Sequence, residues 1–157
     1  MKNHIYTFLF SYLAYMAVVE GQIPQINSFN KVVSLDCLEC LCETISDCNL
    51  TLGCTGSTCG PFAITKPYWQ HGGQLILRGD TLDNETQAFE NCCNDVFCAG
   101  DTIQGYMRTF KQDCNGDGVI DCYDFGAIHT LGPYGCKGEV PQWYGSKLRR
   151  CIEKSHK

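Results

Sequence analysis

The segment between residues 113 and 124 carries closely spaced oxygen-bearing side chains of the kind that bind a hard cation. It follows the calcium-loop pattern, with oxygen ligands at loop positions 1, 3, 5, 9 and 12, glycine at position 6 and a backbone carbonyl at position 7. Since such a cation needs several oxygens converging on a tight turn, the pattern favours a calcium site. The ligands it predicts are Asp113, Asn115, Asp117, Val119 through its carbonyl, Asp121 and Asp124.

Two features of this segment favour a different interpretation, a polar loop of Asx turns held by disulfides. Position 12 is Asp124, which is shorter than the bidentate Glu usual there. Cys114 and Cys122 lie within the loop, and disulfides to other parts of the chain would bend it. Apart from this calcium, no cofactor is expected.

Thirteen cysteines form the second informative set. Zinc sites use paired Cys-x-x-Cys units or histidines at ligand spacing, and only Cys37 and Cys40 make such a pair, so we expect disulfides. Their connectivity stays open. Cys92 and Cys93 are adjacent and cannot easily both reach separate partners, so one of them is the candidate for the spare thiol. If it is Cys93, the bridged cysteines are Cys37, Cys40, Cys42, Cys48, Cys54, Cys59, Cys92, Cys98, Cys114, Cys122, Cys136 and Cys151.

The N-terminus has the form of a secretory signal peptide over residues 1–21. A short polar start is followed by an apolar run that is shorter than the roughly 20 residues of a membrane-spanning helix. No second apolar run follows, so we expect a soluble, secreted protein. The formal net charge of −5 argues against nucleic acid and membranes as partners, because both attract basic surfaces.

Periodicity and turn residues predict an α+β chain that is mostly helical, with a small β region. Residues 49–60 are rich in Gly, Thr and Ser and are expected to form a loop. The expected helices cover residues 37–48, 84–98, 101–111 and 122–131, with one more between 136 and 157, and the expected strands cover 60–65 and 74–78.

Four ordered pieces of sequence carry a family resemblance: the run Cys-Leu-Glu-Cys-Leu-Cys from Cys37, Cys-Gly-Pro-Phe-Ala-Ile at 59–64, Tyr68 with Trp69, and the segment from Ile128 to Cys136. Together they resemble the invertebrate-type lysozymes of the destabilase family. The resemblance implies a lysozyme-like fold with a cleft between helices and a small β region, acting on the β-1,4-linked glycan of bacterial peptidoglycan. It divides the chain into the signal peptide, an N-terminal arm (22–36), the lysozyme-like domain (37–151) and a tail (152–157).

The residues expected to carry the chemistry are missing. Hydrolysis of the glycosidic bond takes two carboxyl groups, one protonated and one ionised. The family's acid is a Glu three residues after the second cysteine of Cys-x-Cys, and that position is Ile45. The family's second carboxylate is an Asp between the cysteines that correspond to Cys54 and Cys59, and this segment is short and has no acid. No catalytic residue is therefore assigned.

Neighbouring side chains do not replace this pair. Glu43 and Asp47 each lie two residues from Ile45, about 200° around a helix, so both should point away from its face. The isopeptidase activity of some family members is attributed to a Ser and a Lys, and the matching positions are Thr58 and Thr65. A threonine hydroxyl without an adjacent base is a poor nucleophile.

The resemblance also implies a sugar-binding surface made of Phe62, Ile64, Tyr68, Trp69 and His129. The alternative is that the aromatic residues belong to the core and that His129 lies near helix-end carbonyls. The sequence thus predicts a secreted lysozyme homologue, for defence or digestion, with weak or absent muramidase activity. Two alternatives stay open: a non-catalytic protein that binds peptidoglycan or modulates immunity, and a hydrolase that uses other carboxylates such as Asp36 or Glu39.

Overall fold

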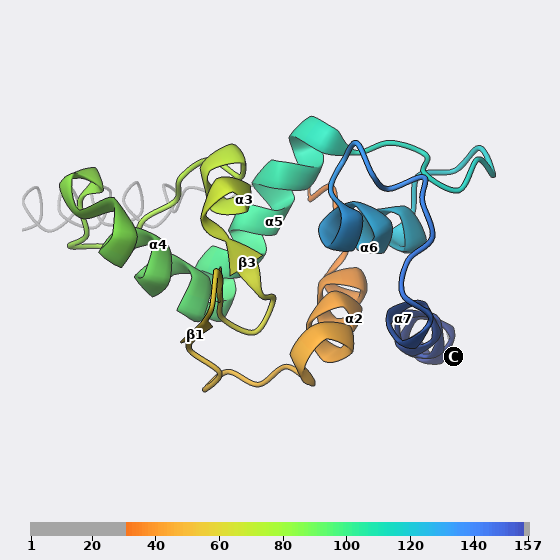
Figure 1. The fold of residues 1–157 in the computed structure, drawn as a ribbon, viewed down its shortest axis with the longest axis horizontal. Helices are drawn as coiled ribbons and strands as arrows, with labels where there is room; N and C mark the ends of the chain where they lie inside the picture. The colour runs from red at the N-terminus through yellow and green to blue at the C-terminus, as the bar shows by residue number, and fades with distance from the viewer. Residues whose placement is uncertain (1–30, 156–157) are drawn as a thin grey trace, which may run out of the picture. The chain divides into compact units, whose positions relative to one another are not determined.

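The computed structural model describes residues 31–155, so the predicted signal peptide and most of the predicted N-terminal arm lie outside the described part. In Figure 1, α5 runs between two groups: α3, α4 and the strands on one side, and α2, α6 and α7 on the other. The elements, in chain order, are α2 (Leu35–Ser46), β1 (Cys54–Thr55), β2 (Thr58–Cys59), β3 (Ile64–Thr65), α3 (Lys66–His71), the 3-10 helix η1 (Leu82–Asn84), α4 (Glu85–Asn94), α5 (Val96–Phe110), α6 (Cys122–Leu131) and α7 (Gln142–Ser155).

The helix that opens the domain, α2, begins two residues before the predicted start. The Ser34 hydroxyl accepts a hydrogen bond from the Cys37 amide and caps the helix. The helix ends at Asp47, which takes a left-handed conformation with φ of 53°. Upstream of the cap, Val33 is fully buried and exchanges two backbone hydrogen bonds with the Gln104 side chain. This part of the predicted arm is therefore packed against α5.

The β region differs from the prediction. Residues 49–60, expected to be a loop, contain the antiparallel hairpin of β1 and β2, closed by the Cys54–Cys59 disulfide between paired residues. Only Ile64 and Thr65 of the predicted 60–65 strand are extended, and they pair with β2. The predicted strand at 74–78 is wrong: this segment has no strand.

The helix α3 was not predicted. The Thr65 hydroxyl accepts from the Tyr68 amide, and Pro67 suits the first helical turn. After this helix, the Trp69 indole donates to the Leu75 carbonyl at 2.8 Å, which holds residues 74–78 against α3 instead of in a sheet.

The remaining helices follow the prediction with shifted ends. α4 and α5 meet at Asp95, whose carboxylate accepts from the Phe97 and Cys98 amides and starts α5 earlier than expected. α6 spans the predicted residues 122–131. No helix within residues 31–155 is long and apolar enough to cross a membrane.

Six disulfides join these elements within the described residues. Two of them join α2 to other helices, Cys37–Cys122 to α6 and Cys40–Cys151 to α7. The other four are Cys42–Cys48, Cys54–Cys59, Cys92–Cys98 and Cys114–Cys136. Cys93 is unpaired and fully buried in the core.

Candidate active site

The position expected to hold the catalytic acid lies in the last turn of α2. Ile45 is half-buried there, and its side chain packs against the hydrophobic core. One residue later, the Ser46 hydroxyl donates to the Pro61 carbonyl at 2.7 Å, which joins the end of α2 to the turn before β3. An aliphatic side chain thus lies where the family's proton donor is expected.

The acids beside Ile45 face α7. Asp47 forms an ion pair with Lys147 of α7 at 2.7 Å. Glu43 Oε2 lies 3.5 Å from Cys151 Sγ, a disulfide sulfur that has no proton to donate. Both contacts are with α7, which the Cys40–Cys151 disulfide joins to α2. Glu43 and Asp47 therefore share one side of α2, as their spacing of four residues predicts.

The second expected carboxylate would lie in the hairpin of β1 and β2. Thr55 pairs with Thr58, so Gly56 and Ser57 form a two-residue turn, and Gly56 has a positive φ of 62°. Nothing acidic is present in this turn. The short connection also leaves little chain that could carry a carboxylate toward α2.

The residues at the predicted isopeptidase positions do come together. Thr58 and Thr65 are cross-strand partners in β2 and β3. The Thr58 hydroxyl donates to the Thr55 carbonyl, and the Thr65 hydroxyl caps α3. Lys66 is held by Glu85 in an ion pair of 2.9 Å. Both hydroxyls serve the backbone, so no base activates them.

Two of the predicted sugar-binding residues, Tyr68 and His129, lie in one aromatic wall with Tyr106 and Phe110. Tyr68 stacks on Tyr106, with ring centroids 3.6 Å apart and planes 11° from parallel. His129 packs edge-on against Tyr68, and Phe110 packs against Tyr106. The backbone carbonyl of Phe62 is hydrogen-bonded to the His129 ring.

Two hydrogen bonds fix the protonation of His129. Its Nε2 lies 2.9 Å from the Phe62 carbonyl oxygen, which can only accept, so Nε2 carries the proton. Nδ1 then accepts from the Tyr68 hydroxyl at 3.2 Å. Burial lowers the pKa of His129, opposed by the Phe62 carbonyl, and burial together with Tyr106 raises the pKa of Tyr68. Both groups are therefore neutral at physiological pH.

Most of the predicted sugar-binding residues are core residues. Trp69 is fully buried, and Ile64, Phe62 and Tyr68 are 1%, 3% and 8% exposed, whereas His129 is half-buried. Ile64 and Trp69 thus belong to the hydrophobic core. Sequence reasoning missed Tyr106, because its stacking on Tyr68 joins two helices that are far apart in the chain.

The predicted calcium loop is satisfied by its own backbone. Asp113 accepts from the amides of Gly116 and Gly118, and these bonds, that of Gly118 foremost, hold its pKa below the usual value. Asp124 is 1% exposed, and its two oxygens accept from the amides of Cys114, Asn115 and Asp121. Across residues 31–155, no group of three or more His, Cys, Asp or Glu side chains is placed to hold a metal ion.

Sequence comparison settles the family. The model of the Destabilase family matches residues 34–151. The chain belongs to the destabilase family. It is 36% identical to invertebrate-type lysozyme 3 of Caenorhabditis elegans over 121 residues, covering 73% of this chain and 84% of that protein. It is also 33% identical to invertebrate-type lysozyme 6 of the same organism over 125 residues, covering 75% and 88%.

The fold of this destabilase-family chain agrees with solved lysozymes. It matches the crystal structure of Aeromonas hydrophila PliI in complex with Meretrix lusoria lysozyme, with a TM-score of 0.61 and 27% identity, over 76% of this chain and 90% of that one. The predicted lysozyme-like α+β fold and the predicted family are thus confirmed. As a destabilase-family member, the chain belongs with glycosidases that generally need no cofactor.

Proposed function

We propose that this chain is an exported invertebrate-type lysozyme homologue that binds peptidoglycan and hydrolyses it weakly or not at all. One observation carries the proposal: the end of α2 presents Ile45, and the hairpin of β1 and β2 has no acid. The six disulfides support export to an oxidising compartment. Defence against bacteria, or digestion of them, is the role that the family suggests.

The missing carboxyls remove the chemical step. A general acid contributes roughly 10²–10⁴-fold to the rate, and an aliphatic side chain transfers no proton. The general acid of a glycosidase also needs a raised pKa, whereas the pKa values of Glu85 and Asp113 are lowered. Hydrogen bonds from Lys66 and Gln70 lower the pKa of Glu85, and amides lower that of Asp113. Neither keeps its proton at neutral pH.

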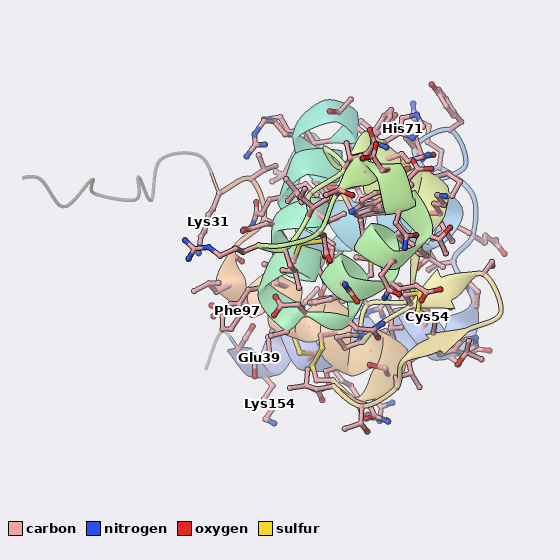
Figure 2. The ribbon with its side chains drawn as sticks, turned by 90° about the vertical axis from the view of Figure 1, so that its left-hand side faces the viewer. Lys31, Glu39, Cys54, His71, Phe97 and Lys154 are labelled. Atoms are coloured by element: carbon pink, nitrogen blue, oxygen red, sulfur yellow. A yellow bond between two sulfur atoms is a disulfide. The ribbon has the colours of Figure 1, made fainter. Side chains whose placement is uncertain are left out.

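The alternative carboxylates on α2 lie elsewhere. Asp36 and Glu39 are exposed near the start of the helix, away from Ile45 in its last turn. Figure 2 draws Glu39 on the part of the surface that also carries Phe97 and Lys154, while Cys54 of the hairpin lies across the view. These positions support binding without turnover over a relocated catalytic pair.

Two assays on the purified mature protein test the proposal. We expect lysis of Gram-positive cell walls at the level of the buffer control, and co-sedimentation with insoluble peptidoglycan. Robust lysis that disappears in Asp36→Asn or Glu39→Gln would show a relocated carboxylate and overturn the proposal. Co-sedimentation without lysis supports it, and the absence of both would point to another ligand class. Glu153→Gln, a change at an exposed acid of α7, is the matched control.

A further inference from the structure

Two triplets of the form Asn-x-Thr occur in the chain, one that begins at Asn49 and one that begins at Asn84. This triplet is the acceptor sequence for N-linked glycosylation in chains that enter the secretory pathway. Because such triplets also arise by chance, the sequence alone does not choose between the two. The surroundings of the two asparagines differ, and they favour the first.

Asn49 lies in a short loop between α2 and β1 that is held at both ends. Figure 1 shows this loop along the lower edge of the view. The Asn49 amide donates to the carbonyl and to the side-chain hydroxyl of Ser46, at 3.1 and 3.2 Å. At the other end, the Gly60 amide donates to the Gly53 carbonyl at 2.9 Å, and a disulfide flanks the loop on each side. The backbone is therefore fixed, while residues 49–52 are exposed.

The side chain of Asn49 is joined to the threonine of its own triplet. Asn49 Oδ1 accepts from the Thr51 amide at 3.0 Å and from the Thr51 hydroxyl at 2.8 Å. A backbone amide can only donate, so the atom that faces it is the oxygen. Nδ2 is the other atom of the planar carboxamide and makes no hydrogen bond within residues 31–155. The nitrogen that receives a glycan is thus free and exposed.

Asn84 has a different role. Its Oδ1 accepts from the Gln87 amide at 3.3 Å and caps α4. Thr86, the threonine of this triplet, is the second residue of α4, and Glu85 between them is held by Lys66 in an ion pair of 2.9 Å. The Asn84 side chain therefore belongs to the start of a helix, which makes Asn49 the stronger candidate.

The loop around Asn49 also exposes apolar side chains. Leu50 and Leu52 are 57% and 41% exposed. Single exposed leucines are common on protein surfaces. These two, however, lie on either side of Thr51 in one short loop, next to the acceptor nitrogen. A bulky, polar oligosaccharide on Asn49 would keep both of them from contact with other molecules.

We propose that Asn49 carries an N-linked oligosaccharide that covers Leu50 and Leu52. In the transfer step, Asn49 Nδ2 attacks the anomeric carbon of an oligosaccharide that is linked to a lipid diphosphate. The C–N bond forms as the C–O bond to the diphosphate breaks, the lipid diphosphate leaves with the electron pair, and a base of the transferase takes one proton from Nδ2. The proposal rests on export, which is part of the function proposed above, but not on peptidoglycan binding.

The test expresses the full chain in cultured mammalian cells and measures its mass before and after treatment with peptide-N-glycosidase. We expect the enzyme to lower the mass and to leave aspartate at position 49. Asn49→Gln and Thr51→Val should abolish this shift, whereas the matched controls Asn84→Gln and Thr51→Ser should retain it. The shift is read in cell extracts as well as in the medium, so a variant that folds poorly still reports its modification.

A second version of the chain, in which an established secretory signal replaces residues 1–21, separates the glycan from export. An unmodified chain in this version, in the medium or in the extract, would overturn the proposal, as would a shift that Asn49→Gln leaves unchanged. A chain that is modified and exported only with the replaced signal would support the glycan and contradict the predicted signal peptide.

The covering of the two leucines is tested on the purified proteins by light scattering. Asn49→Gln should aggregate at a lower concentration than the glycosylated protein, and adding Leu50→Ser to this variant should restore its solubility. Melting curves control for folding. Equal aggregation with and without the glycan, or no recovery with Leu50→Ser, would refute the covering role.

Discussion

Replacing Ile45 with glutamate tests whether the end of α2 still provides the environment of a general acid. Full burial of an isoleucine contributes about 1.5–3 kcal/mol, so loss of this half-buried side chain should cost about 1 kcal/mol. A negative charge in the last turn opposes the helix dipole by a further 0.3–1 kcal/mol, roughly. Ile45→Glu should therefore lower the free energy of unfolding by about 1.5–2 kcal/mol at neutral pH.

The pH dependence has a definite sign. Partial burial and the helix C-terminus both disfavour the ionised carboxyl, so its pKa in the folded state should rise above the ordinary value of about 4.3. The unfolded state then loses its proton first as the pH rises, and stability falls between the two pKa values. The deficit of Ile45→Glu should be about 1 kcal/mol near pH 4 and reach its full size above the folded-state pKa.

Denaturant unfolding at pH 4, 6 and 8 measures this deficit, with Ile45→Gln as the uncharged control of matching shape. We expect the deficit of Ile45→Gln to be independent of pH. An identical pH profile for the two variants would refute the reasoning, because it would mean that position 45 is open to water. Ile45→Glu should not restore cell-wall lysis, since the hairpin still lacks the second carboxylate; lysis by this variant would show that the second carboxylate exists elsewhere.

Three further predictions concern other groups. His129→Gln should lower the free energy of unfolding by about 1–2 kcal/mol at pH 7.5 through its bonds to Phe62 and Tyr68. Since burial lowers the His129 pKa, the unfolded state binds the proton first as the pH falls below about 6.5, and the wild-type advantage in denaturant unfolding should shrink from pH 7 to pH 5. Cys93 should resist iodoacetamide at pH 8 until the protein is denatured, as mass spectrometry would show, because burial raises its pKa to about 12; rapid labelling of the native protein would contradict this. Millimolar calcium should leave the melting temperature unchanged relative to a chelator, because backbone amides already occupy both oxygens of Asp124, and a calcium-dependent rise would show that the loop rearranges to bind the ion.

Local signals predicted most of the helices, because helix ends depend on residues close in sequence, but α3 was missed. Asp121 and Asp124 form a capping box at the start of α6, and Gly132 ends it with a positive φ of 75°. The strand expected at 74–78 failed because a side chain outside the segment bonds to its backbone: the Trp69 indole, six residues before Leu75, donates to the Leu75 carbonyl. The β1–β2 hairpin was missed because its strands are two residues long and are closed by a disulfide.

The candidate site divides in the same way. The identity of Ile45 and the acid-free hairpin are present in the sequence, and the helical angle predicted that Glu43 and Asp47 face elsewhere. The stacking of Tyr106 on Tyr68 depends on two segments that only the tertiary fold brings together. Periodicity marks a side chain as buried but does not name its neighbour.

The two disulfides that leave α2 have a consequence for how the chain is made. Cys37 and Cys40 pair with residues 85 and 111 positions further along. At synthesis rates of about 5–20 residues per second, each thiol waits roughly 4–22 s for its partner. Cys42, Cys48, Cys54 and Cys59 emerge much sooner and are available for premature bridges. Any early bridge to Cys37 or Cys40 must be reshuffled before the native pairs form, so we expect recombinant yield to rise with a thiol-exchange buffer or an isomerase.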